Sequence, residues 1–401
     1  MKILLVSNSL THYYNRVLSK LNDDPDIDLT VVVPGNGSQS VGAGVYQATE
    51  GINFKVVEVS EKLLFGKIPH LSGLADVLIN VAPDVVILVV EYSLLLALDL
   101  RLRRAIRKIG CKVIIKSIPF RIEAFDARLR AIAGANGKQQ GMSRFSVWRW
   151  IRTAKVYVDR YIYCSADAHL NYIDAKDMWA SYGVPAEKVF VSGNSPDTDK
   201  LLEVSDELGD VSATTAFNPF RIVHVGRLVA WKRVDLLLQA FRILKDKFPR
   251  AELIVVGDGP ELESLKQQAM QLEVDHSVTF RGAIYDPREL GSALKACSVY
   301  VLAGMGGLSI NDAMCFGLPI VCSVCDGTEA ALVHEGINGT YFKEGDCADL
   351  VERISELLRN PELSREMGRH SVDIIRERVN VRRVLDEYKR AFYFVCSYPA
   401  A

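Results

Sequence analysis

The chain has 401 residues, of which 49% are hydrophobic and 24% charged, as in an ordinary soluble globular protein. This length exceeds one typical core, so two domains are expected. A net charge of −1 gives no chain-wide field that would favour nucleic acid. The longest apolar runs fall short of the roughly 20 residues of a membrane span, and the run at 3–6 is too short for a signal peptide. We therefore expect a cytoplasmic protein.

Short β-branched runs alternate with helical patterns along the chain, which predicts α/β domains with parallel sheets and crossover helices. The predicted strands of the first half are 2–6, 29–33, 54–57, 85–89, 112–116, 161–164 and 188–191. Those of the second half are 221–225, 252–256, 277–281, 299–302, 320–322 and 339–342. Helices are predicted near 346–359, 361–378 and 381–394. The polar stretch 204–219 breaks this rhythm and is typical of an interdomain linker.

The segment 101–155 is strongly basic, with 15 Lys and Arg residues against Glu123 and Asp126. Trp148 and Trp150 are interleaved with these charges. Two interpretations stay open. The segment is a solvated helical surface with its tryptophans in the core, or it is an interfacial helix lying on an anionic membrane.

Three loops of the second half carry the pattern of an anion-binding site. Gly226-Arg227, followed by Lys232, comes directly after a strand, where a guanidinium and an ammonium group suit a diphosphate. The stretch 255–261 begins like a dinucleotide fingerprint, but Leu262 stands where a third glycine is needed, which argues against a nicotinamide cofactor. The run 304–314 follows a strand and opens a helix, so its glycines can bring backbone N–H groups to an anion.

In this order, these motifs resemble the retaining glycosyltransferases of family four, strongly over residues 220–345 and elsewhere by architecture only. They read Gly-Arg…Lys, Val-Gly-Asp-Gly-Pro, Gly-Leu-x-x-x-Asp-Ala-Met…Gly-x-Pro-x-Val and Glu329…Gly-x-Asn-Gly. The resemblance implies a GT-B fold with two facing Rossmann-like domains: an acceptor domain at 1–203, a nucleotide-sugar domain at 219–380, and a final helix at 381–401 that crosses back. It also implies retention of anomeric configuration and no metal or other cofactor.

The resemblance also assigns roles in the donor site. Arg227 and Lys232 would bind the diphosphate and stabilise the departing nucleotide. Asp312 would replace the usual ribose-binding glutamate. The remaining donor-binding candidates are Gly226, Arg281, Gly306, Gly307, Leu308 and Glu329.

Two positions depart from the family pattern. The family usually has two glutamates eight positions apart, and the first of them, which contacts the donor sugar, is Gly304 here. The family also commonly places a histidine after a strand in the middle of the N-terminal domain, and the run 114–121 has none. A reaction in which the leaving phosphate takes the acceptor proton does not require that histidine.

The first half offers candidates at the carboxyl ends of its strands, where open sheets bind ligands. His12 and Tyr13 follow the first strand, and Glu91 and Tyr92 follow the strand at 85–89. With Arg121 they are the candidate acceptor contacts, and His12 and Glu91 are also candidate catalytic groups. A surface histidine and a helix-capping glutamate are the structural alternatives. The Asp-x-Asp triplets at 26–28 and 197–199 are interpreted as turn and cap residues, so no metal site is predicted.

The favoured function is transfer of a sugar from a nucleotide-sugar donor, with UDP preferred, to a glycan or lipid-linked glycan in polysaccharide or glycolipid biosynthesis. Attachment to the inner face of the cell membrane would fit the basic segment. Two alternatives stay open: a catalytically silent scaffold with the same fold, and a GT-B nucleotide-sugar epimerase.

Overall fold

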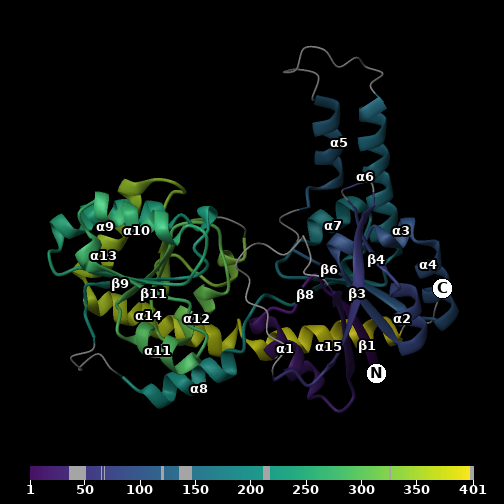
Figure 1. The fold of residues 1–401 in the computed structure, drawn as a ribbon, viewed down its shortest axis with the longest axis horizontal. Helices are drawn as coiled ribbons and strands as arrows, with labels where there is room; N and C mark the ends of the chain where they lie inside the picture. Colours follow the sequence, from purple (N-terminus) through teal and green to yellow (C-terminus); the bar gives the residue numbers. More distant parts are fainter. Residues whose placement is uncertain are drawn as a thin grey trace. The chain divides into compact units, whose positions relative to one another are not determined.

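The computed structural model describes residues 1–35, 51–64, 66, 68–118, 122–134, 147–210, 217–324 and 327–397. They form two compact units (Figure 1). Unit 1 holds the described residues up to Ser192 together with those from Val384 onward, and unit 2 holds the described residues between them, from Gly193 to Arg383. This division lies before the predicted boundary at 203, and the predicted linker begins inside a helix, Thr198–Leu208, in which Val204 and Ser205 are buried.

Unit 1 is built on an eight-stranded sheet in the order β4-β3-β2-β1-β5-β6-β7-β8. Its strands are β1 (Lys2–Val6), β2 (Asp28–Pro34), β3 (Lys55–Leu64), β4 (Ile68–Ser72), β5 (Val85–Val89), β6 (Lys112–Ser117), β7 (Ala168–Asn171) and β8 (Val189–Val191). All neighbours are parallel except β3 and β4. Its helices are α1 (His12–Asn22), α2 (Leu74–Val81), α3 (Leu95–Leu98), α4 (Leu100–Ile109), α5 (Phe125–Gly134), α6 (Val147–Ser165), α7 (Lys176–Tyr182) and most of α15 (Val381–Ser397).

Unit 2 is built on a six-stranded parallel sheet in the order β11-β10-β9-β12-β13-β14. The strands are β9 (Arg221–Val225), β10 (Glu252–Val256), β11 (Val278–Gly282), β12 (Val299–Leu302), β13 (Ile320–Cys322) and β14 (Gly339–Tyr341). The helices are α8 (Thr198–Leu208), α9 (Val234–Lys247), α10 (Leu262–Gln271), α11 (Pro287–Lys295), α12 (Ser309–Cys315), α13 (Cys347–Arg359) and α14 (Pro361–Glu377).

Polar side chains fix where several helices begin. Asp99 accepts hydrogen bonds from the N–H groups of Arg101 and Leu102 at the start of α4. Asp197, Asp286, Asp346 and Asn360 cap α8, α11, α13 and α14 in the same way. Such caps satisfy N–H groups that have no partner inside the helix. The role predicted for Asp197 is confirmed.

Most predicted strands are confirmed within one or two residues, and one is wrong. Residues 161–164 end helix α6, in which Ile162 and Tyr163 are buried. Strands β4 and β7 were not predicted. Trp148 and Trp150 of α6 are 68% and 69% exposed, so the interpretation that placed both tryptophans in the core is also wrong.

Candidate functional site

In unit 2 the order of the strands reverses between β9 and β12. From β9 the chain continues to β10 on one side, whereas β12 pairs with β9 on the other. Loops that leave neighbouring strands in opposite directions open a crevice at the carboxyl edge of an open α/β sheet. The loop after β9 contains Gly226, Arg227 and Lys232, and the loop after β12 contains Gly304, Gly306 and Gly307. The topology thus brings two of the three predicted motifs to one place.

The third motif, Gly257-Asp258-Gly259, supports the loop after β9. A Cβ atom at Gly257 would lie 1.8 Å from the carbonyl oxygen of Gly226, and one at Gly259 would lie 2.4 Å from that of Leu228. The N–H of Leu228 donates to the carbonyl of Asp258 at 2.9 Å. These glycines are required by close backbone packing, which fixes the loop that carries Lys232.

Lys232 joins the two loops at the switch point. Its side chain is 7% exposed, and its Nζ donates to the carbonyl oxygens of Met305 and Gly306 at 2.8 and 2.6 Å. A Cβ atom at Gly307 would lie 2.8 Å from that Nζ. The lysine is therefore held against the glycine loop by charge-assisted hydrogen bonds, with its ammonium group beside Gly306 and Gly307.

The departure at Gly304 has a structural cause. A Cβ atom there would lie 2.2 Å from the carbonyl oxygen of Trp231 and 2.6 Å from the carbonyl carbon of Lys232. The next residue, Met305, donates its N–H to the same Trp231 oxygen at 2.8 Å. The backbone of the first loop thus occupies the space that any side chain at 304 would need.

The other predicted donor residues are more dispersed. Arg227 stacks on the ring of Trp231 at 5.8 Å, whereas the exposed Arg281 pairs with Glu289 at 3.6 Å. Glu329 is 1% exposed and accepts the N–H of Gly327 at 3.2 Å. Leu308 and Asp312 lie at the start and in the first turn of α12. Of the predicted donor residues, Gly226, Gly306 and Gly307 lie directly against the lysine.

A buried histidine beneath this edge was not predicted. His224 of β9 is fully buried, its Nδ1 lies 3.0 Å from the carbonyl oxygen of Val301, and its ring stacks on Tyr300. Burial lowers the pKa of His224 to about 4, so the imidazole is neutral near pH 7. A Cβ atom at Gly226 would lie 3.4 Å from its Nε2. His224 thus lies between the first loop and the core. A histidine inside an otherwise apolar strand is the sequence feature from which this residue could have been predicted.

Unit 1 has a switch point of its own, because β1 pairs with β2 on one side and with β5 on the other. His12 opens α1 after β1, where its ring contacts that of Tyr13, which is 38% exposed. Glu91 is exposed in a short 3-10 helix, Val90–Tyr92, after β5. Tyr92, predicted as an acceptor contact, is 1% exposed, and its hydroxyl donates to Glu61 at 2.7 Å, so its side chain is part of the core. Arg121 lies outside the described residues.

The main residue that the sequence analysis missed in unit 1 is Lys116, at the end of β6. It is 5% exposed and donates to the hydroxyl of Tyr14, which is also hydrogen-bonded to that of Tyr388 at 2.9 Å. Its Nζ lies 3.8, 5.0 and 5.6 Å from the ring centres of Tyr14, Tyr172 and Tyr388. Burial lowers the pKa of Lys116 to about 7, and the negative charge of Glu91 opposes this shift. A lysine that interrupts an otherwise apolar strand is the sequence feature from which Lys116 could have been predicted.

No group of three or more His, Cys, Asp or Glu residues that could hold a metal ion occurs in the described part of the chain. Within the same ranges, no helix is both long and apolar enough to cross a bilayer.

Two units with mainly parallel sheets, one of them carrying a glycine loop bound by a lysine at its switch point, give the chain the GT-B fold. Residues 212–372 match the model of the family described as "Glycosyl transferases group 1".

Relatives agree with this assignment. The chain is 32% identical over 228 residues to "Uncharacterized glycosyltransferase MJ1069" of Methanocaldococcus jannaschii, which covers 55% of this chain and 54% of that protein. It is 31% identical over 171 residues to an uncharacterized glycosyltransferase of Haemophilus influenzae, covering 42% and 47%. The match therefore spans about half the length of these relatives. The solved structure of Anabaena Alr3699/HepE in complex with UDP is similar in fold, with a TM-score of 0.67 at 18% identity over 97% of this chain and 99% of that one.

Proposed function

We propose that this protein is a retaining glycosyltransferase that moves a sugar from a nucleotide-sugar donor, UDP-sugar preferred, to a glycan or lipid-linked glycan acceptor without a metal ion. The observation that carries the proposal is Lys232, buried at the β9–β12 switch point with its ammonium group on the glycine loop. The family match over residues 212–372 supports the reaction class, and the UDP bound in Anabaena HepE supports the choice of nucleotide.

In the proposed reaction, the donor diphosphate lies against the loops after β9 and β12. Among the described residues, no backbone carbonyl accepts the N–H of Gly306 or Gly307, so these donors are available to phosphate oxygens. As the bond between the sugar and the diphosphate breaks, negative charge builds on the leaving phosphate. Lys232 and Arg227 stabilise that charge from fixed positions. The leaving phosphate takes the proton of the acceptor hydroxyl, which attacks from the same face, so configuration is retained.

The proposed acceptor side is the carboxyl edge of unit 1. His12, Tyr13 and Glu91 follow β1 and β5 there, and the charge of Glu91 acts on the buried Lys116. The sugar, the acceptor and the new linkage would be set by the side chains around this edge.

The test is calorimetry with UDP, GDP and ADP, followed by a turnover assay with the UDP-sugar that binds. We expect UDP to bind and Lys232→Met to lower turnover at least about 100-fold, which corresponds to about 2.7 kcal/mol of transition-state stabilisation. Lys295→Met is a matched control, because Lys295 also donates to a backbone carbonyl, that of Gly209 at 2.6 Å, but belongs to neither loop. No binding of any nucleotide, or a Lys232 variant as active as the control, would refute the proposal and favour a silent scaffold.

A further inference from the structure

Helix α6 carries a row of apolar side chains that are exposed in the described part of the chain, although Tyr157 also contacts the ring of Phe125. Residues that recur every three or four positions lie on one side of a helix. The exposed fractions are 69% for Trp150, 52% for Ile151 and 53% for Tyr157. We call this row the α6 stripe; its members are Val147, Trp150, Ile151, Ala154, Tyr157, Val158 and Tyr161.

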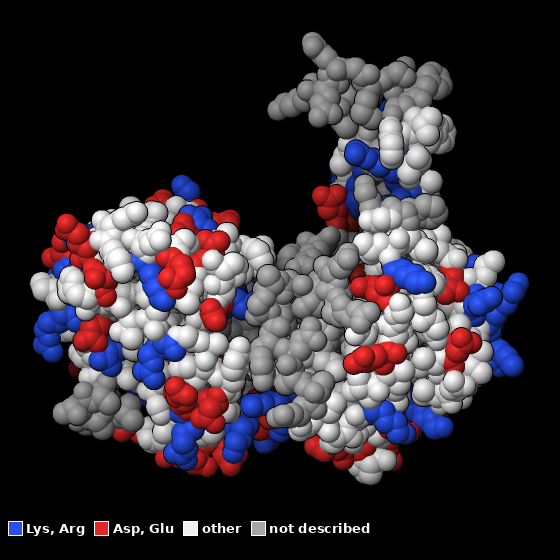
Figure 2. Space-filling view, viewed as in Figure 1, with Lys and Arg blue, Asp and Glu red and all other residues white. Residues whose placement is uncertain are grey.

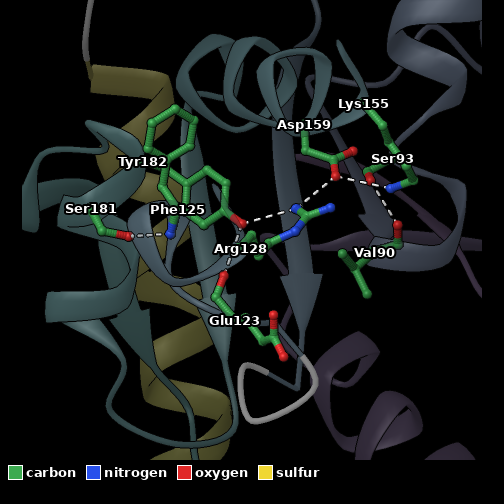
Figure 3. Close-up of polar contacts among 9 residues, drawn as sticks. All are labelled: Val90, Ser93, Glu123, Phe125, Arg128, Lys155, Asp159, Ser181 and Tyr182. Atoms are coloured by element: carbon green, nitrogen blue, oxygen red, sulfur yellow. Dashed lines mark hydrogen bonds and ion pairs between the residues drawn. The ribbon is translucent and has the colours of Figure 1, made fainter. Parts of the chain in front are cut away.

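The base of the stripe, around Asp159, is held in place by hydrogen bonds and ion pairs (Figure 3). Arg128 of α5 donates to Asp159 of α6 at 2.8 Å and to the hydroxyl of Tyr182 of α7 at 2.9 Å. Lys155 donates to the same carboxylate at 2.9 Å, and Tyr182 donates to the carbonyl of Glu123 at 2.9 Å. Asp159 is 6% exposed, so this ion-pair network is partly shielded from water. It fixes the lower part of α6 against α5 and α7.

Above this base, α5 and α6 run side by side and project from the sheet of unit 1 (Figure 1). Ile162 and Tyr163, near the end of α6, are buried, whereas almost every residue from 147 to 155 is exposed. The upper part of the stripe, around Trp150 and Ile151, therefore lies on an arm outside the core of unit 1. Contiguous exposed apolar surface of this kind marks an interaction site.

The charged side chains of the same helix favour an anionic partner. Arg149, Arg152 and Lys155 fall outside the three- and four-residue spacing of the stripe and so lie on the other sides of α6, and no acidic residue occurs between Val147 and Lys155. In Figure 2 the described part of the arm shows basic side chains next to uncharged surface. Tryptophan and tyrosine with interleaved Arg and Lys match the boundary between headgroups and acyl chains in an anionic bilayer.

We propose that the α6 stripe docks this protein on an anionic lipid bilayer. Trp150 and Ile151 enter the boundary between headgroups and acyl chains, and Arg149 and Arg152 bind lipid phosphates. The proposal rests on the proposed function only for its purpose: an enzyme that glycosylates a lipid-linked acceptor must work at a membrane surface.

The experiment is co-sedimentation of the full chain with vesicles of phosphatidylcholine alone and of phosphatidylcholine mixed with phosphatidylglycerol. We expect binding to the mixed vesicles only, and weaker binding as salt rises. Arg149→Gln with Arg152→Gln should lower the partition coefficient about 30-fold. Trp150→Ser with Ile151→Ser should lower it about 100-fold.

Controls remove the same chemistry elsewhere. Arg365→Gln with Arg369→Gln deletes two exposed arginines of α14, and Ile243→Ser deletes a 42% exposed isoleucine of α9. Both controls should sediment as wild type. All variants should keep wild-type melting temperature and UDP affinity, because the stripe and the glycine loop lie in different units.

Equal sedimentation with neutral and anionic vesicles would overturn the proposal, as would stripe variants that bind like wild type. Dimerisation of the wild type that Trp150→Ser abolishes would assign the stripe to a second copy and also overturn it. Vesicle binding without any UDP binding would leave docking intact and refute only the transferase function.

Discussion

The close backbone approach at Gly304 predicts that a side chain cannot be added there. In Gly304→Ala the new Cβ would lie 2.2 Å from the Trp231 oxygen and 2.6 Å from the Lys232 carbonyl carbon. Both are backbone atoms, so no rotamer change relieves the clash and the loop after β9 must move. Overpacking of this kind costs about 1–3 kcal/mol. For a unit of this size, that lowers the melting temperature by about 2–12 °C.

The assay is thermal unfolding in parallel with UDP calorimetry, because movement of Trp231 and Lys232 should also weaken donor binding. Gly304→Glu, which restores the usual family residue, should behave no better than Gly304→Ala. Gly134→Ala is the control, since a Cβ atom at the end of α5 meets nothing within 4 Å. A Gly304→Ala protein that melts within about 1 °C of wild type and binds UDP normally would show that the space is open and the reasoning wrong.

Two further predictions concern unit 1. Burial lowers the pKa of Lys116 from 10.5 to about 7, so the folded state releases a proton that the unfolded state still holds between those values. The free-energy cost of burying the charged lysine is fully present below pH 7 and disappears as the pH rises toward 10.5. Lys116→Met should therefore stabilise the protein by about 3 kcal/mol in urea unfolding at pH 6 and by much less at pH 10. A pH-independent difference would contradict this. Arg128→Met should cost about 2–4 kcal/mol, because it leaves the buried Asp159 with only Lys155; a cost below about 0.5 kcal/mol would mean that the network does not anchor α6.

The sequence was sufficient for much of the fold because the sheets are buried on both faces. Apolar runs such as those of β1, β5 and β9 have few alternatives to a central parallel strand, and the structure places them there. Residues 161–164 were mispredicted for the opposite reason. Tyr161, Ile162 and Tyr163 favour a strand locally, but their positions continue the helical phase of α6, and the packing of Ile162 and Tyr163 against unit 1 decides the outcome.

The two candidate sites also differ in how far the sequence could predict them. Each motif around Lys232 is a short contiguous stretch that follows a strand, so the motifs could be recognised and assigned to one edge. The surroundings of Lys116 could not, because Tyr14, Tyr172 and Tyr388 come from an early helix, the end of β7 and the last helix. Nothing local indicates that three tyrosines far apart in the chain meet at one lysine.

Gly304 shows most directly how a departure from a family pattern should be weighed. In the sequence it is a missing glutamate, and the loss of a sugar contact is one reason to consider a silent scaffold as an alternative. In the structure the same residue is the point where the loop after β12 closes on the loop after β9, through the hydrogen bond from Met305 to Trp231. That closure brings the carbonyl groups of Met305 and Gly306 within reach of Lys232. A glutamate at 304 would push apart the two loops that hold the lysine. The absent side chain is therefore part of how this chain positions its cation, which argues for a retained anion site in which the sugar is contacted by other residues.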